Sequence, residues 1–73
     1  MTLDNETIEI IVNGSPRNVA ATTTIASLIE TMNLPWRFVA VERNLELVPR
    51  ARHAESVLAA GDRLEIVTLV GGG

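Results

Sequence analysis

One short amphipathic helix, set among runs of strand-forming residues, restricts the folds that this chain can adopt. Apolar side chains recur at the helical spacing i, i+3, i+4 and i+7 in the set Ile25, Leu28, Ile29 and Met32. The threonines before Ile25 offer an N-cap, Asn33 can close the helix, and Pro35 prevents its continuation. We therefore expect one helix from about Ile25 to Asn33. A chain of 73 residues has only a small core, so this helix must pack on the rest of the domain.

Strand patterns lie on both sides of this helix. Before it, Thr7–Val12 is rich in β-branched residues, and Asn13-Gly14 favours a tight hairpin into a return strand at about 17–20. After it, we expect strands over 38–43 and 46–48, an irregular segment over 50–58 with one helical turn near 54–57, a turn at Gly61-Asp62, and a final strand over 63–70.

This order of elements predicts an α+β fold. A hairpin, a crossover helix and further strands make a mixed sheet with one face covered by the helix. The most economical arrangement places the last strand beside the first, parallel to it, in the middle of the sheet. We expect a ubiquitin-like β-grasp, with four to five strands packed on one helix, over residues 1–70, and a flexible glycine tail over 71–73.

Composition excludes several functional classes. The chain has no cysteine, so it has no disulfide framework and no thiolate metal site. Its net charge of −3 argues against nucleic-acid binding. It shows no signal peptide and no long apolar run, which indicates a cytoplasmic protein without membrane association. It also lacks an ATP-binding loop and a catalytic triad, so we expect no catalytic residue and no bound metal.

Strand alternation predicts an exposed apolar face that binds a partner protein. Glu9, Glu42 and Glu65 mark the outer face of their strands. The apolar residues that share this face are Ile11, Phe38, Ala40, Val67 and Leu69. An apolar surface ringed by charges is typical of a protein-binding site. The alternative is that the segment 50–60 covers some of these side chains.

Several single residues have a structural interpretation that we prefer to a functional one. We expect His53 to be a surface or capping residue, and Trp36 to fill a gap in the packing rather than to bind a ligand. We interpret Asp62 and Glu65 as solvated charges rather than an acid–base pair. Arg50 and Arg52 are also expected to be solvated, although they could face an acidic patch on a partner.

The sequence ends in Gly71-Gly72-Gly73. Glycine has no Cβ, so such a tail is slender and flexible and adds no packing to the domain. We expect it to present the carboxylate of Gly73 to the active site of another protein. The alternatives are a frayed terminus and an expression remnant.

These features together resemble a known group of proteins. The segments that carry the resemblance are Val12-Asn13-Gly14, the run 39–44 leading to Val48-Pro49-Arg50, the run 61–67, and the ending Val70-Gly71-Gly72-Gly73. In them the chain resembles the ubiquitin-like sulfur carrier proteins, and among these most closely the ThiS family. The additional Gly71 leaves the terminal glycine pair intact.

The resemblance implies a chemistry and a set of partners. The carboxylate of Gly73 would be adenylated by an adenylyltransferase similar to ThiF or MoeB, which consumes ATP and Mg²⁺. A sulfur donor such as a cysteine desulfurase would convert the acyl-adenylate to a thiocarboxylate. A thiazole synthase similar to ThiG would then take the sulfur for thiamine biosynthesis. The chain would be a carrier and cosubstrate rather than an enzyme, would hold no cofactor itself, and would be a monomer when free.

Three alternatives stay open at this point. The final sulfur acceptor could instead be molybdopterin, tRNA or cysteine. The chain could be a ubiquitin-like modifier that forms isopeptide bonds with lysines of other proteins. It could also be a β-grasp interaction module whose tail carries no chemistry.

Overall fold

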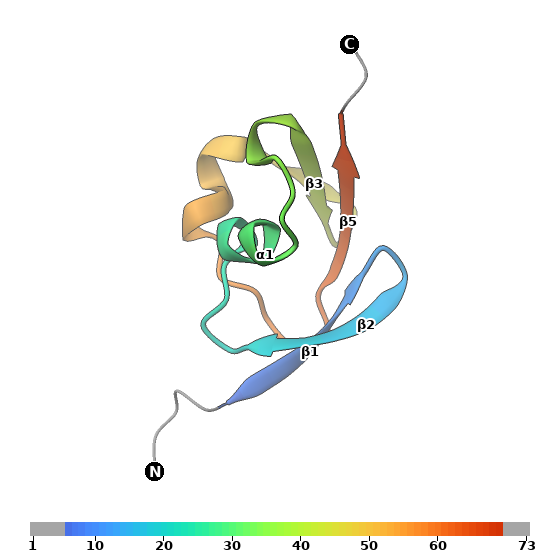
Figure 1. The fold of residues 1–73 in the computed structure, drawn as a ribbon. Coiled ribbons are helices and arrows are strands. Elements are labelled where there is room, and N and C mark those ends of the chain that lie inside the picture. The colour runs from blue at the N-terminus through green and yellow to red at the C-terminus, as the bar shows by residue number, and fades with distance from the viewer. Residues whose placement is uncertain (1–5, 70–73) are drawn as a thin grey trace.

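The computed structural model describes residues 6–69, which form one mixed sheet packed on a helical layer (Figure 1). The strand order is β2-β1-β5-β3-β4. β5 therefore lies in the middle, parallel to β1 and antiparallel to β3. This confirms the β-grasp prediction, with five strands. The elements are β1 (Thr7–Val12), β2 (Ser15–Ala20), α1 (Ile25–Thr31), η2 (Trp36–Phe38), β3 (Val39–Arg43), β4 (Glu46–Val48), η3 (Arg50–Glu55) and β5 (Arg63–Thr68), where η marks a 3₁₀ helix.

The hairpin between β1 and β2 turns at Asn13-Gly14, as the sequence predicts. The φ angles are +50° at Asn13 and +86° at Gly14, so both central residues take the positive φ that a type I′ turn requires. Val12 pairs directly with Ser15 across this two-residue turn. The return strand therefore begins at Ser15, earlier than the expected start near residue 17.

Helix α1 is fixed at both ends by its own sequence. Thr24 is the N-cap, and it exchanges hydrogen bonds with Ser27: each side chain accepts from the other residue's backbone N–H. The helix ends at Thr31, two residues before the predicted end, because Asn33 adopts a left-handed conformation with φ of +59°. Pro35 lies beyond this turn, where it precedes η2.

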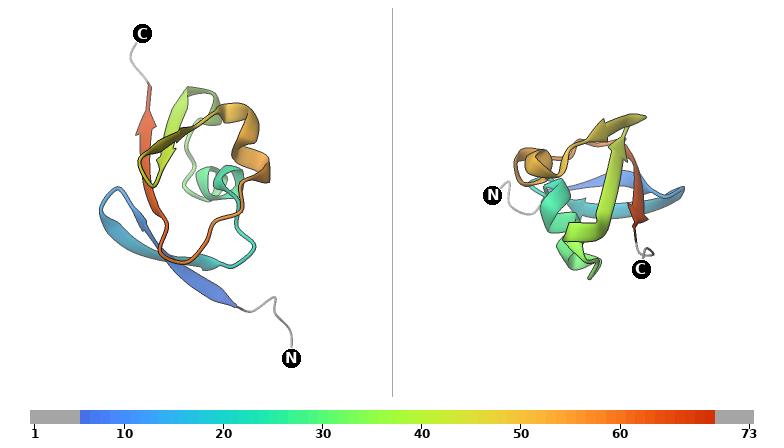
Figure 2. Two further views of the ribbon diagram at one scale, coloured as in Figure 1. Left: turned by 180° about the vertical axis from the view of Figure 1, so that it is seen from behind. Right: turned by 90° about the horizontal axis from the view of Figure 1, so that it is seen from above.

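The core lies between the helical layer and one face of the sheet. α1 and η3 lie on the same face (Figure 2). The buried apolar residues come from α1, β1, β3, β5 and the segment before β5, and they are Ile10, Val12, Ile25, Leu28, Ile29, Val39, Val41, Leu58, Leu64 and Ile66. In β1, β3 and β5 these buried residues alternate with the exposed Glu9, Glu42 and Glu65, which marks the outer face as predicted.

Two segments differ from the sequence-based expectation. The helical turn predicted near 54–57 lies earlier, because η3 starts directly after Pro49, while Val57 forms an isolated bridge with Thr24 instead. β3 starts at Val39, one residue late, because Phe38 belongs to η2. No helix within residues 6–69 is both long and apolar enough to cross a lipid bilayer.

Candidate functional site

An exposed apolar surface lies at the C-terminal end of β5. Along this strand Leu64 and Ile66 are buried, whereas Val67 is 53% exposed and Leu69, just beyond it, is 58% exposed. Ala40 pairs directly with Val67, and the backbone N–H of Leu69 donates to the carbonyl of Phe38, which is also exposed. Four of the five predicted partner-binding residues are therefore neighbours. The segment 50–60 does not cover Val67 or Leu69.

Ile11 does not join this surface. It pairs with Arg63, at the opposite end of β5 from Val67. The exposed Glu65 lies between these two positions on the outer face. Alternation along a strand identified the correct face for Ile11, but its distance from the others depends on the parallel register, which the sequence pattern does not give.

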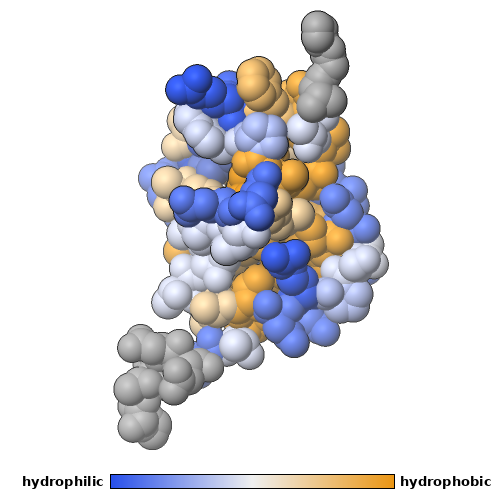
Figure 3. Space-filling model, in the orientation of Figure 1, coloured by the Kyte–Doolittle hydropathy of each residue, from blue (hydrophilic) through white to orange (hydrophobic). Residues whose placement is uncertain are grey.

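Leu47 extends the surface on its other side and was missing from the prediction. It pairs with Glu42, so it lies on the outer face, one diagonal step from Ala40. Its side chain is exposed. Strand alternation could have predicted this position, because Leu47 must face the side opposite to its neighbour Val48, which packs against the core. We call Phe38, Ala40, Leu47, Val67 and Leu69 the apolar sheet face; Figure 3 shows hydrophobic surface along the side of the molecule where β5 runs.

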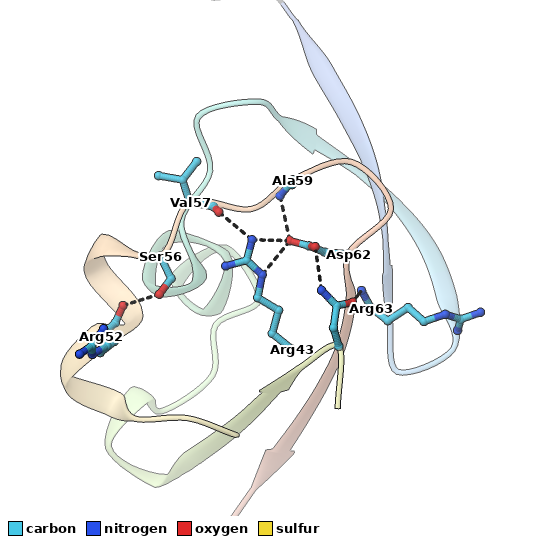
Figure 4. Close-up of polar contacts among 8 residues, drawn as sticks. Arg43, Arg52, Ser56, Val57, Ala59, Asp62 and Arg63 are labelled. Carbon is cyan, nitrogen blue, oxygen red and sulfur yellow. Dashed lines mark hydrogen bonds and ion pairs between the residues drawn. The ribbon is translucent and has the colours of Figure 1, made fainter. Parts of the chain in front are cut away.

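A buried carboxylate holds the turn that leads into β5. Asp62 is only 7% exposed, so its interpretation as a solvated charge is wrong. Its Oδ2 accepts hydrogen bonds from Arg43 Nε at 2.9 Å and from the N–H of Ala59 at 2.8 Å, and its Oδ1 accepts from Asn44 Nδ2 at 3.1 Å. Arg43 Nη2 lies 2.8 Å from the same carboxylate and also donates to the carbonyl of Val57 (Figure 4).

The protonation of Asp62 follows from these contacts. Burial on its own would raise the pKa of the Asp62 carboxyl. The hydrogen bonds from Ala59, Asn44 and Arg43, together with the charge of Arg43, outweigh burial and lower this pKa below its ordinary value. Asp62 is therefore ionised near neutral pH. Glu65, which was also interpreted as a solvated charge, is exposed as expected.

The side chain of Asn13 holds the second half of β5. Its Oδ1 accepts from the N–H of Ile66 at 2.7 Å, and its Nδ2 donates to the carbonyl of Ile66 at 3.1 Å. The chain turns away from β5 at Asn13, after the hydrogen bond from Asn13 N–H to the carbonyl of Leu64. The amide of Asn13 therefore continues the sheet pairing where the β1 backbone no longer can. This fixes the direction of β5 toward its C-terminal end.

A groove with an exposed tryptophan lies on the other side of the molecule, in the helical layer. Its volume is about 490 Å³, and it is lined by α1, Trp36 and η3. Trp36 is 56% exposed, so it does not fill a gap in the packing as predicted, because η2 is a single turn with no buried residue. His53 is only 4% exposed and its Nε2 lies 3.0 Å from the carbonyl of Val48, so the prediction of a surface position is wrong.

The remaining predicted residues are those of the glycine tail. Gly71, Gly72 and Gly73 fall outside residues 6–69, and so do parts of the predicted division into a domain and a tail. Within residues 6–69, no three His, Cys, Asp or Glu side chains come together in a way that could hold a metal ion.

Comparisons with known proteins agree on one family. A model described as the ThiS family matches residues 10–73. The sulfur carrier protein ThiS of Bacillus subtilis is 42% identical over 52 residues, which cover 71% of this chain and 79% of that protein. A crystal structure of the thiamine biosynthesis protein ThiS from Geobacter metallireducens aligns with a TM-score of 0.77 and 28% identity, over 90% of this chain and 100% of that one.

Two longer proteins match as well. A thiazole synthase of Paramagnetospirillum magneticum is 42% identical over 66 residues, which are 90% of this chain but 20% of that protein. A thiazole synthase of Magnetococcus marinus is 38% identical over the same shares. The chain thus spans about a fifth of the length of these two relatives.

Proposed function

The chain belongs to the ThiS family, and we propose that it is a sulfur carrier for the formation of the thiazole ring in thiamine biosynthesis. The observation that carries the proposal is the apolar sheet face, which lies at the end of β5 next to the residues that lead to Gly73. A partner that binds this face would contact the chain at Leu69, two positions before Gly71 in the sequence. The protein itself would act as a cosubstrate rather than as a catalyst.

The proposed chemistry takes place at the carboxylate of Gly73. An oxygen of this carboxylate attacks the α-phosphate of ATP, held with Mg²⁺ on a ThiF- or MoeB-like adenylyltransferase, and pyrophosphate leaves. A persulfide on a sulfur donor, such as a cysteine desulfurase, attacks the acyl carbon and AMP leaves. Reduction of the resulting acyl disulfide by a thiol releases the thiocarboxylate. A ThiG-like thiazole synthase then accepts the sulfur.

The fold supports this chemistry because it holds β5, the strand that precedes the glycines, in a fixed position. β5 is bonded to β3 along its length and to β1 and Asn13 on its other side, so the last strand is firmly placed. Three glycines after such a strand would let a narrow active site reach the carboxylate without meeting side chains. The two thiazole synthases that match this chain support the choice of thiazole synthase as the acceptor enzyme.

The proposal is tested by the intact mass of the purified chain. It is measured before and after incubation with the adenylyltransferase of the same organism, ATP, Mg²⁺, a cysteine desulfurase with cysteine, and a thiol. We expect one oxygen to be replaced by sulfur, and no replacement in a variant that lacks both Gly72 and Gly73, in which no terminal glycine pair is left. Addition of the thiazole synthase with its other substrates should return the original mass.

Other outcomes separate the alternatives. An unchanged mass in the presence of an active adenylyltransferase would contradict the carrier role. Recovery of Gly73 in isopeptide linkage to lysines of other proteins would indicate a ubiquitin-like modifier. A thiocarboxylate that the thiazole synthase leaves intact would keep the carrier role but point to molybdopterin, tRNA or cysteine as the acceptor.

A further inference from the structure

The groove in the helical layer carries a feature that sulfur transfer at Gly73 does not use. Trp36 is the only tryptophan of the chain, and more than half of its surface is exposed beside the groove. Large aromatic side chains are enriched in protein interfaces, where they bury much surface at a small cost in conformational entropy. Ala26 and Ile29 of α1 and Ala54 of η3 give the groove an apolar lining next to this ring.

Two arginines gather around the same ring. The guanidinium carbon of Arg37 lies 5.2 Å from the centre of the Trp36 ring, and that of Arg50 lies 6.0 Å away. Arg50 is held in place, since its Nη1 donates to the backbone carbonyl of Arg37 at 2.6 Å. Among residues 6–69, the one ion pair is that of Arg43 with Asp62. The positive charges of Arg37 and Arg50 therefore have no carboxylate partner in the described part of the chain.

We propose that this groove is a second docking site, which binds an acidic peptide segment of a partner protein. The exposed Trp36 and the apolar lining would take an aliphatic side chain of that segment, and Arg50 would bind its carboxylate. Arginine suits this role because its planar guanidinium donates two parallel hydrogen bonds to a carboxylate. The complementary charge is that of Arg50, which lines the groove, with Arg37 beside the ring of Trp36; neither forms an ion pair within residues 6–69.

The acidic member of the lining limits the kind of anion that fits. Glu30 projects from α1 into the same groove. A polyphosphate would meet repulsion there, whereas a peptide that offers one carboxylate to Arg50 can keep its distance from Glu30. This favours an acidic peptide over a nucleotide.

The position of the groove allows two partners to be bound at once. The groove lies in the layer formed by α1 and η3, which covers one face of the sheet, while the apolar sheet face lies on the other. A protein on the groove would leave Val67 and Leu69 free. This inference goes beyond the proposed function, because it does not depend on the chemistry of Gly73.

The test uses the fluorescence of Trp36 in the full chain. The probe is a short blocked peptide of leucines with a single glutamate, and its control is the same peptide with glutamine in place of that glutamate. We expect a saturable change of Trp36 emission with the acidic peptide and about tenfold weaker binding of the glutamine peptide. Arg50→Gln should weaken binding of the acidic peptide about tenfold. Arg52→Gln removes an equal charge from the same helix, outside the groove, and should leave binding unchanged.

A second variant is needed because Arg50→Gln also removes the hydrogen bond from Arg50 to the carbonyl of Arg37. Ala54→Glu places a carboxylate at the groove without removing an arginine, and it should abolish binding of the acidic peptide. Amide chemical shifts should move around Ala54 and not around Val67. No saturable change, equal binding of both peptides, or shifts confined to the sheet face would overturn the proposal. Saturation by Mg²⁺-ATP instead of the peptide would overturn it in favour of a nucleotide site. The assay contains no activating enzyme, so its failure would leave the proposal for Gly73 untouched.

Discussion

At the scale of single residues, Asp62 joins the turn before β5 to the end of β3, which is distant in sequence. Its carboxylate accepts from Arg43 and Asn44 at the end of β3 and from Ala59 in the turn before β5. The side chain of Asn44 in turn accepts from the N–H of Arg63, the first residue of β5. The start of β5 is therefore held by charge-assisted hydrogen bonds as well as by sheet pairing.

We expect Asp62 to make stability depend on pH in acid. Its pKa is lowered in the folded protein, so its contribution is complete above the ordinary value of about 3.9 and is lost as the pH falls through the lower folded pKa. Asp62→Asn should lower the free energy of unfolding near neutral pH by about 2 kcal/mol. It should also flatten the decline below about pH 4. Urea unfolding at several pH values measures both effects.

The matched control is Glu65→Gln, an exposed position on β5, the strand that follows Asp62. It removes the same charge and should change the free energy of unfolding by less than about 0.5 kcal/mol. If Asp62→Asn kept the wild-type stability and its decline in acid, Asp62 would not be the group responsible.

The two roles of Asn13 can be separated by two substitutions. Asn13→Gly keeps the positive φ but loses both side-chain bonds to Ile66, and we expect a loss of about 1–3 kcal/mol in the free energy of unfolding. Asn13→Ala loses the same bonds and adds the cost of a left-handed conformation, about 1 kcal/mol more. Chemical denaturation of both variants measures the difference. Equal stability of Asn13→Gly and the wild type would show that the contacts with Ile66 contribute nothing.

The errors at this scale share a physical cause. The sequence shows that Asp62 is charged and that His53 is a lone polar residue, but their burial depends on partners outside the local pattern. The partners of Asp62 in β3 lie 18 and 19 positions away. Asn13 was predicted correctly as a turn residue, because φ preference is local, whereas its bond to Ile66 spans 53 positions.

At the scale of elements, local chemistry predicted most boundaries. Periodicity located α1, and its end at Thr31 follows from the left-handed Asn33. The 3₁₀ helix η3 was misplaced because 3₁₀ helices are short and have no strong apolar period. It starts directly after Pro49, and the ring of His53 within it lies in hydrogen-bond distance of the carbonyl of Val48, five positions earlier.

The N-cap of α1 should contribute measurably to stability. Thr24→Ala removes the acceptor of the Ser27 N–H, and we expect the free energy of unfolding to fall by about 1 kcal/mol. Thr22→Ala is the control, because Thr22 lies in the exposed turn before the cap. Thermal or urea unfolding of the two variants tests this. A loss at Thr22 as large as that at Thr24 would rule out a specific effect of the cap.

At the scale of the whole molecule, the pairing of β5 with β3 on one side and with β1 on the other decides which residues form the apolar sheet face. Alternation in the sequence identified the correct side for Ile11, Val67 and Ala40. Their grouping depends on register, which pairs Ala40 with Val67 but aligns Ile11 with Arg63. The sequence pattern could therefore predict the face but not its contiguous part.

Partner binding should follow this grouping. Val67→Glu places a charge in the apolar sheet face, and we expect it to weaken binding to the proposed adenylyltransferase partner by about tenfold or more. Ile11→Thr changes a residue on the same side of the sheet but outside the apolar sheet face, and it should weaken binding far less. Titration calorimetry with the purified enzyme measures both. A larger effect at Ile11 would mean that the partner binds elsewhere, and thermal unfolding verifies that both variants fold.

The parallel pairing of β1 with β5 also determines how the molecule responds to a mechanical load. One strand begins at Thr7 and the other ends at Thr68, at opposite ends of the parallel pair. A pull on the two ends acts along both strands, so it loads their cross-links in shear rather than one after another. Ile11, Asn13 and Gly61 supply backbone cross-links, and the Asn13 amide adds its own. A pull along β5 therefore loads these cross-links together, so several hydrogen bonds must break at once before the two strands separate.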